Sequence, residues 1–198
     1  GQLRRTVFVC IFWTCIVTPY FAIFTYAPKV LESLNVKSQA TGTILSNTVG
    51  AVGALIGLLA IDRIGRRRML IGPFWVQMVV LLVVGLWTNA PSWVLVLGLA
   101  VFALVNSYSD ILTAVYPSEI FDTDIRSSGV GLGSAMSRIG AFLGTYLLPI
   151  GMGTIGIKWC MVIAAGLCVI GAVTGQFMAP ETMNRSLTRT STGELMDT

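Results

Sequence analysis

The sequence contains no histidine and has few charged side chains of either sign. Charged residues make up 11% of its 198 residues, whereas a typical soluble domain has about 25%. So few charges cannot cover a water-facing surface, which argues against a soluble protein. Without histidine, Ser/His and Cys/His nucleophile pairs and imidazole metal sites are excluded. We therefore expect a membrane protein that uses neither a cofactor nor a metal.

Cysteine is also scarce, and its spacing excludes two further kinds of site. The four cysteines are Cys10, Cys15, Cys160 and Cys168, and no two of them form a CxxC pair. Such spacing is typical of neither a disulfide framework nor a zinc site. Because all four lie inside apolar runs, we expect them to pack as small hydrophobic side chains.

Long apolar runs dominate what is present, since hydrophobic residues make up 55% of the chain. About 20 mostly apolar residues are needed for one helix to cross a bilayer. Six runs of this kind are visible, at about residues 7–27, 43–61, 69–87, 93–115, 129–154 and 159–178. The sequence therefore predicts an all-α membrane protein with six transmembrane helices in residues 1–179, followed by a polar tail in residues 180–198.

The charges between these runs predict an orientation. With the N-terminus inside, three lysines lie outside (Lys29, Lys37 and Lys158) and nearly all the arginines lie inside. Cytoplasmic loops of membrane proteins carry an excess of basic residues. We therefore expect both termini in the cytoplasm and the chain in the plasma membrane, which is the inner membrane of a bacterium. The chain begins with Gly1 rather than Met, which indicates a fragment or a processed chain.

The second connection carries an acid and a cluster of arginines in the order Asp-Arg-Ile-Gly-Arg-Arg-Arg, at residues 62–68. Glycine permits a tight turn here, and the acid can pair with an arginine at the membrane surface. Simple anchoring by positive charge is the alternative interpretation.

This loop resembles the signature loop of the major facilitator superfamily. Two more stretches resemble its sugar-porter and metabolite:proton symporter families: YPSEIFDTDIRSSGVG at residues 116–131 and PETMNRSL at residues 180–187. The resemblance implies six helices arranged as a 3+3 inverted repeat, which form the C-terminal half of a twelve-helix transporter. It also implies an N-terminal six-helix half as partner, with a small-molecule substrate, protons and the lipid bilayer, and no nucleic acid.

The resemblance implies a role for the charges at the cytoplasmic ends of the helices. They would form a gating network that holds the helix ends together and breaks when the inside opens. The members of this predicted network are Asp62, Arg63, Arg66, Arg67, Glu119, Arg126 and Glu181.

Two ionisable residues lie inside predicted spans, where charges are costly and usually functional. Asp110 lies about 9 Å of helix rise before Tyr116, and Arg138 about 15 Å after Ser128. The two can form a structural ion pair. Alternatively, Asp110 handles a proton or the substrate with Arg138 as its counter-charge, or Arg138 extends to the membrane surface.

Other polar side chains gather on the first and fourth spans, which line the central cavity in the family that the chain resembles. Ordinary hydrogen bonding between helices is the alternative role for each of them. The predicted substrate-binding residues are Thr18, Tyr20, Tyr26, Asn106, Ser107, Asp110 and Arg138.

One part of the sugar-porter pattern is missing. Cys15 and Ile16 stand where sugar porters have two glutamines, and Phe21 stands where they have an asparagine. The fourth span also has Ala114 in place of their tryptophan. We therefore expect proton-coupled symport of an organic or aromatic acid by alternating access, with a sugar or polyol as the alternative cargo.

Two other classes of protein compete with a transporter. An intramembrane protease needs a histidine beside its serine or two intramembrane acids, and only Asp110 qualifies as such an acid. A membrane sensor or scaffold that keeps the fold without transport remains an alternative. The chain by itself is expected to bind substrate weakly and not to transport.

Overall fold

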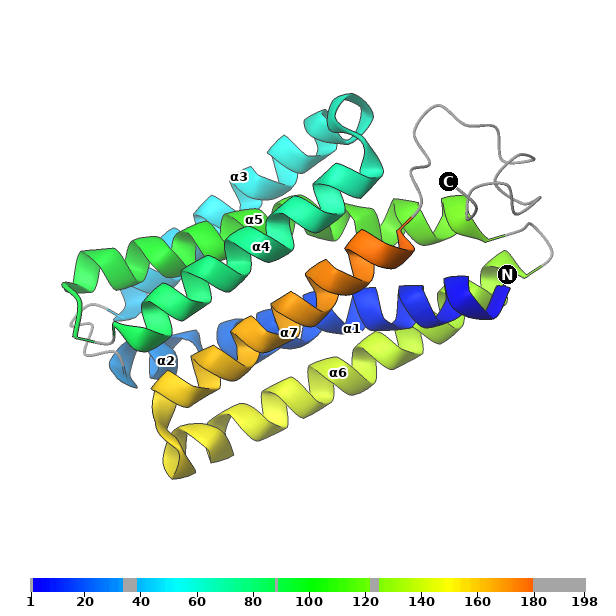
Figure 1. Cartoon of the computed structure of the whole chain (residues 1–198). Helices are drawn as coiled ribbons and strands as arrows, with labels where there is room; N and C mark the ends of the chain where they lie inside the picture. Colours follow the sequence, from blue (N-terminus) through cyan, green and yellow to red (C-terminus); the bar gives the residue numbers. More distant parts are fainter. Residues whose placement is uncertain (1, 34–38, 88, 122–124, 180–198) are drawn as a thin grey trace.

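The computed structural model describes residues 2–33, 39–87, 89–121 and 125–179. These residues form seven α-helices, of which six are long and run side by side in an elongated bundle (Figure 1). The helices are α1 (Gln2–Thr25), α2 (Ala27–Ser33), α3 (Gln39–Ile64), α4 (Arg66–Leu86), α5 (Ser92–Ile120), α6 (Arg126–Thr154) and α7 (Gly156–Met178). The predicted polar tail, residues 180–198, lies outside the described residues.

Each predicted span lies largely within one long helix, and short turns join several of them. A single residue, Gly65, separates α3 from α4, with a φ of 91°. Gly156, with a φ of 83°, opens α7 directly after α6. Both values fall in the left-handed region that glycine enters without steric cost. The chain can therefore reverse direction within one or two residues.

The packing follows the 3+3 inverted repeat. The most extensive contacts join α1 to α6, α3 to α5 and α4 to α7. In the repeat, α1 corresponds to α5, α3 to α6 and α4 to α7. When corresponding helices are exchanged, the α1/α6 contact becomes the α5/α3 contact. The same exchange turns the α4/α5 contact into the α7/α1 contact, which also exists. The repeat is thus visible in which helices touch.

Among the described residues, five helices are long and apolar enough to cross a membrane on their own composition: α1, α3, α4, α5 and α7. The sixth, α6, has 29 residues but is rich in glycine and serine and contains Arg138. It lies along α1, where Gly133 and Gly140 leave no room for a side chain against Trp13 and Thr14. Small residues of this kind let membrane helices approach closely. The glycines of α6 therefore allow its close packing on α1.

The two ends of the bundle differ in their charges. The first residues of α1, the α3–α4 turn, the end of α5 and the end of α7 meet at one end, together with the N-terminus (Figure 1). We call this the arginine end. Just inside it, Phe8 and Phe12 of α1 pack edge-on against Tyr116 of α5, with ring centroids 5.9 and 6.5 Å apart. Tyr116 is fully buried, so the first residue of the YPSEI stretch belongs to the core.

Candidate functional site

One ion pair at the arginine end joins two of the predicted network residues. The Arg66 guanidinium on α4 donates to Glu119 Oε1 on α5 at 3.1 Å from Nη2 and 3.3 Å from Nε. It also donates to the Ile61 carbonyl of α3 at 3.0 Å. Both charged side chains are largely shielded, with 14% and 20% exposure. Arg66 therefore ties together the ends of three helices.

Three further arginines at this end, Arg4, Arg5 and Arg67, bind the last carbonyl groups of neighbouring helices. Arg5 on α1 is buried and donates to the Ile120 carbonyl that ends α5, at 3.2 Å. Arg4 and Arg67 both donate to α7, to the carbonyls of Phe177 and Gln176 at 2.9 Å each. A cation at a helix C-terminus satisfies orphan carbonyls and complements the helix dipole. Sequence reasoning missed this role of Arg4 and Arg5, because the partner carbonyls belong to distant helices.

The remaining members of the predicted network lie differently. Arg63 is exposed, and Arg126 is partly buried at the start of α6. Its Nε has no hydrogen-bond partner in the described part of the chain. The side chain of Asp62 and the whole of Glu181 lie outside the described residues.

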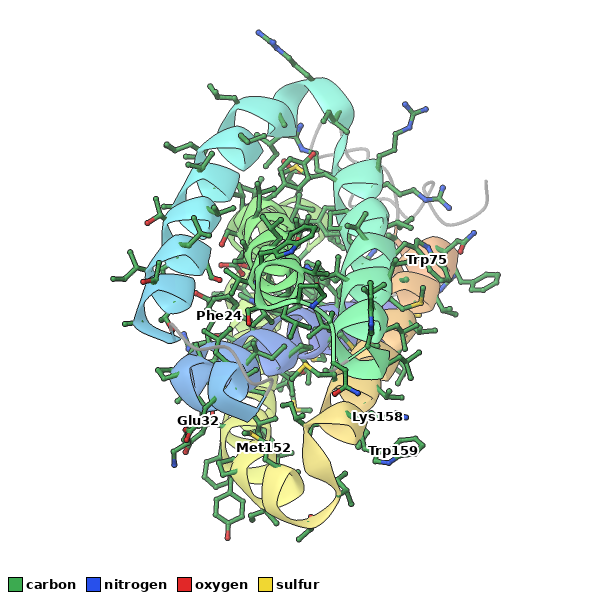
Figure 2. All side chains as sticks on the ribbon, turned by 90° about the vertical axis from the view of Figure 1, so that its left-hand side faces the viewer. Phe24, Glu32, Trp75, Met152, Lys158 and Trp159 are labelled. Atoms are coloured by element: carbon green, nitrogen blue, oxygen red, sulfur yellow. The ribbon has the colours of Figure 1, made fainter. Side chains whose placement is uncertain are left out.

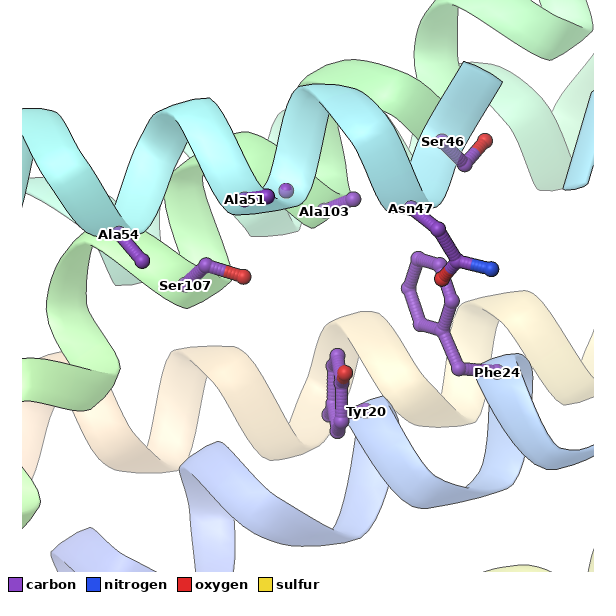
Figure 3. A pocket seen from close by; sticks show the side chains of 9 residues that line it. Tyr20, Phe24, Ser46, Asn47, Ala51, Ala54, Ala103 and Ser107 are labelled. Atoms are coloured by element: carbon purple, nitrogen blue, oxygen red, sulfur yellow. The ribbon is translucent and has the colours of Figure 1, made fainter. Parts of the chain in front are cut away.

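A cavity of about 230 Å³ lies between α1, α3 and α5, nearer the opposite end of the bundle. We call it the Tyr20 cavity (Figure 3). Small residues of α3 and α5 form its wall, and polar groups come from all three helices. Its lining residues are Tyr20, Phe24, Ser46, Asn47, Gly50, Ala51, Ala54, Ala103 and Ser107.

An aromatic stack closes one side of the Tyr20 cavity. The rings of Tyr20 and Phe24 stack with centroids 4.9 Å apart, and Phe24 stacks in turn on the buried Phe102 of α5 at 6.1 Å. Figure 3 shows the Asn47 amide directed from α3 towards Phe24. The cavity therefore presents a flat apolar wall beside amide and hydroxyl groups.

Ser46 is the least satisfied group in this cavity. The residue is 3% exposed, and its Oγ has no hydrogen-bond partner within the described ranges. A buried hydroxyl without a partner costs about 1–3 kcal/mol, so such groups usually serve a water or a ligand. Neither Ser46 nor Asn47 was among the predicted site residues. The feature of the sequence that could have indicated these two residues is the polar run Ser46-Asn47-Thr48 inside an apolar span.

Asp110 and Arg138 are both exposed in this chain, in the middle stretches of α5 and α6. Asp110 interacts electrostatically with Tyr20 of the cavity and with Arg138. No ion pair within 4.0 Å joins the two charges among the residues described. Asp110 accepts a hydrogen bond from Thr113, one turn further along α5, at 3.4 Å. The structural ion pair, one of the three alternatives for these residues, is therefore not formed within 4.0 Å in the described part of the chain, although the two charges interact electrostatically.

Asn106 does not line the cavity. It is 3% exposed, and its Oδ1 faces the Gln77 amide nitrogen of α4 at 3.4 Å. Gln77, which is fully buried, also accepts a weak hydrogen bond from the Cys168 thiol of α7 at 3.7 Å. Asn106 therefore makes the interhelical hydrogen bond that was the alternative interpretation, while the next residue, Ser107, faces the cavity.

Thr18 and Tyr26 also lie away from the Tyr20 cavity. The Thr18 hydroxyl points at Gly140 of α6 and has no hydrogen-bond partner in the part of the chain that the structure describes. Tyr26 lies between α1 and α2, with the Lys29 ammonium 5.7 Å from its ring centroid. Of the seven predicted substrate residues, the structure brings Tyr20, Ser107, Asp110 and Arg138 to one region.

The inverted repeat of six long helices defines a class of fold, that of the major facilitator superfamily. The chain superposes on the proton:xylose symporter XylE bound to 6-bromo-6-deoxy-D-glucose, with a TM-score of 0.71 and 18% identity over 92% of the chain and 42% of XylE. A double-tryptophan XylE mutant gives a TM-score of 0.79 at 18% identity, over 95% and 42% of the two chains.

The sequence identifies the family. The model of the sugar (and other) transporter family matches residues 2–192. The chain is 36% identical to a protein of Escherichia coli strain K12 that is named as a metabolite transport protein, YaaU, over 93% of this chain and 42% of that one. It is 34% identical to the inner membrane metabolite transport protein YgcS of the same strain, over 90% and 40%. The chain therefore belongs to the sugar (and other) transporter family of the major facilitator superfamily, whose members are membrane transporters and not enzymes. It spans about two fifths of the length of these relatives.

Proposed function

We propose that this chain forms one half of a secondary active transporter that carries a small organic or aromatic acid together with protons. The observation that supports this proposal is the Tyr20 cavity with Asp110 and Arg138 beside it. A second six-helix half would close the cavity from the other side. Substrate would then reach the site from each side of the membrane in turn as the two halves rock.

The two exposed charges favour a charged cargo. Each lies far from the ends of its helix and lacks an ion-pair partner within 4.0 Å among the described residues. A charge held inside a membrane is costly, and such residues usually face a water-filled path or a partner. A guanidinium matches the geometry of a carboxylate, and an intramembrane aspartate is a typical proton carrier. We assign carboxylate recognition to Arg138 and proton transfer to Asp110.

The aromatic stack favours a planar cargo within this class. A flat ligand can pack against Tyr20 while Ser46, Asn47 and Ser107 offer hydrogen bonds to its polar groups. Aromatic pairs contribute about 0.5–1.5 kcal/mol beyond the burial of apolar area. Ser46 would also gain the partner that it lacks.

We also propose that the arginine end faces the cytoplasm and acts as the gate. The excess of basic residues at this end supports the orientation. The contacts of Arg4, Arg5, Arg66 and Arg67 join α1, α3, α4, α5 and α7 within the chain. Such contacts would hold these helix ends together while the cytoplasmic side is closed and would break when it opens.

The test is uptake of radiolabelled benzoate into proteoliposomes that contain the chain assembled with a second half, under an inward proton gradient. We expect Asp110→Asn to abolish accumulation, and Arg138→Gln to raise the KM about tenfold, the equivalent of about 1.4 kcal/mol of lost binding. Glu32→Gln and Lys29→Gln are matched controls, because they remove exposed charges on α2, at the end of the bundle opposite the arginine end. Normal uptake by both site variants would refute the proposal.

A sugar or polyol is the second candidate cargo, and one observation favours it. Cys15 and Ile16 are buried, with 4% and 1% exposure, so glutamines at these positions would face the core of this half. Their absence therefore says little about the cavity, whose hydroxyl and amide lining also suits a sugar. Uptake of radiolabelled xylose that unlabelled xylose, but not benzoate, competes for would favour this alternative. Substrate binding without any uptake by the assembled halves would favour a sensor.

A further inference from the structure

Three polar side chains that do not line the Tyr20 cavity are buried between α4, α5 and α7. Gln77 of α4 and Cys168 of α7 are fully buried, and Asn106 of α5 is 3% exposed. The Gln77 amide nitrogen donates to Asn106 Oδ1 at 3.4 Å, and the Cys168 thiol donates to Gln77 Oε1 at 3.7 Å. Burying polar groups is costly, and two apolar side chains of similar shape would fill the same space at less cost. The amide pair therefore calls for a role other than packing.

The helix that carries Gln77 is held firmly against α7. These two helices form one of the most extensive contacts in the bundle. A methyl group added at Gly171 of α7 would lie 2.6 Å from the ring of Phe74 on α4. Phe74 lies one turn before Gln77, and Gly171 lies one turn after Cys168. Gln77 therefore extends towards α5 from a close-packed pair of helices.

The contact on the other side of α5 fixes its distance from α3 better than its rotation. Seen along the bundle, α5 lies between α3 on one side and α4 on the other (Figure 2). α3 approaches the backbone of α5 with Gly53 and Gly57, and glycines have no side chain that could interlock with a neighbouring helix. Hydrophobic contacts are non-directional, whereas a hydrogen bond depends on the angle between its groups. The amide pair is therefore the contact best suited to fix the rotation of α5 about its axis.

The rotation of α5 decides which of its residues reach the Tyr20 cavity. With 3.6 residues per turn, successive side chains of a helix point about 100° apart. Asn106 faces Gln77 while the next residue, Ser107, lines the cavity. A rotation of α5 by one residue would bring Asn106 to the place of Ser107. It would also turn the exposed Asp110 in another direction.

We propose that Gln77 and Asn106 are positioning residues, whose hydrogen bond holds α5 in the rotation that turns Ser107 towards the Tyr20 cavity. The Cys168 thiol binds the oxygen of the Gln77 amide, and the amide nitrogen is thereby directed at Asn106. Neither amide lines the cavity, so the pair acts through the placement of Ser107. The effect on uptake rests on the proposed function, whereas the rotation of α5 does not.

Two double variants separate positioning from packing. The leucine pair, Gln77→Leu with Asn106→Leu, fills the space without a directional contact. The exchanged pair, Gln77→Asn with Asn106→Gln, keeps two amides and the combined length of the two side chains. Each is combined with Ser107→Cys and Cys10→Ser, which leaves three native cysteines, all of them buried. In detergent, the rate at which a water-soluble thiol reagent labels residue 107 then reports whether this residue faces the cavity.

We expect residue 107 to be labelled severalfold more slowly in the leucine pair than in the unaltered pair, and at nearly the unaltered rate in the exchanged pair. A bundle that had merely loosened would instead expose its buried thiols and be labelled faster. Ser109→Ala is the matched control, because the hydroxyl of this buried residue donates to the Asn106 carbonyl within α5 itself, at 3.0 Å. The control should leave the labelling unchanged. Labelling of the leucine pair as fast as that of the unaltered pair would overturn the proposal and reduce the amides to packing.

Uptake of benzoate by the assembled transporter, with Ser107 retained, is the second measurement. It should fall severalfold in the leucine pair and recover in the exchanged pair. Slow labelling of the leucine pair together with normal uptake would support the fixed rotation and refute the part of Ser107 in the proposed function. No uptake by the unaltered assembly would refute the proposed function itself, and the labelling rates would still decide the rotation of α5.

Discussion

The contact between α3 and α5 provides the sharpest test of the packing, at Gly53. A methyl group added at Gly53 would lie against the carbonyl oxygen of Leu104 and 2.8 Å from its carbonyl carbon. One turn further along α3, a methyl group at Gly57 would lie 2.6 Å from the Tyr108 carbonyl oxygen. These atoms belong to the backbone of α5 and cannot turn aside as a side chain can. Gly53→Ala therefore forces the two helices apart by several tenths of an ångström.

The cost can be set against other core substitutions. Inserting a methyl group into a packed interior costs about 1–3 kcal/mol, and the upper part of this range applies where the backbone must move. For a chain of this size, that loss lowers the midpoint of thermal unfolding by on the order of 5–10 °C. Gly72→Ala is the matched control on α4, because nothing lies within 4 Å of a methyl group there. We expect no loss of stability in the control.

The chain carries a natural reporter for this measurement. Cys15, Cys160 and Cys168 are buried, so a thiol-reactive dye that fluoresces on reaction follows their exposure during heating in detergent. Gly53→Ala should shift the midpoint clearly below that of Gly72→Ala. Equal midpoints would show that α3 and α5 do not approach as closely as their glycines indicate, and the geometry of the Tyr20 cavity would have to be revised.

Two further substitutions test the polar contacts. Glu119→Gln should remove about 1 kcal/mol from the partly shielded pair with Arg66, and should slow uptake by the assembled transporter severalfold while leaving membrane insertion intact. The charge swap Arg66→Glu with Glu119→Arg should restore part of the uptake rate. Unchanged uptake in Glu119→Gln would exclude a gating role. Gln77→Leu should lower the stability measured in the thiol-dye assay by about 1–3 kcal/mol, because it leaves the buried Asn106 amide without its partner. Adding Asn106→Leu should recover most of this loss. Additive losses in the double variant would show that the two amides are not coupled.

Much of the architecture could be predicted from the sequence, because the bilayer imposes it. A backbone inside hydrocarbon must satisfy its own hydrogen bonds, so each apolar run of sufficient length becomes a helix. The turn at Gly65 followed from glycine between two charged helix ends. The family followed from three motifs at the expected junctions, and the family model confirms it.

The site was only partly predictable, because helix rotation is hidden in such a sequence. A soluble helix shows its buried face by the period of its apolar residues. A membrane helix is apolar on all sides, so the period that would separate Asn106 from Ser107 is absent. Only the packing of α4 against α5 turns Asn106 towards Gln77 and leaves Ser107 facing the cavity. For the same reason, the sequence did not show that Ser46 and Asn47 face the cavity.

The sequence by itself thus determined how many long helices form, which family they belong to and which polar residues must be accounted for. The short helix α2 (Ala27–Ser33) was not predicted. Only the tertiary structure decided the partner of each polar group. Arg66 binds Glu119 while Arg5 binds the last carbonyl of α5, and Asp110 and Arg138 remain exposed without an ion pair within 4.0 Å in the described chain. The physical reason is that length and hydrophobicity are properties of a single segment, whereas a hydrogen bond or an ion pair depends on how two distant segments are rotated and placed.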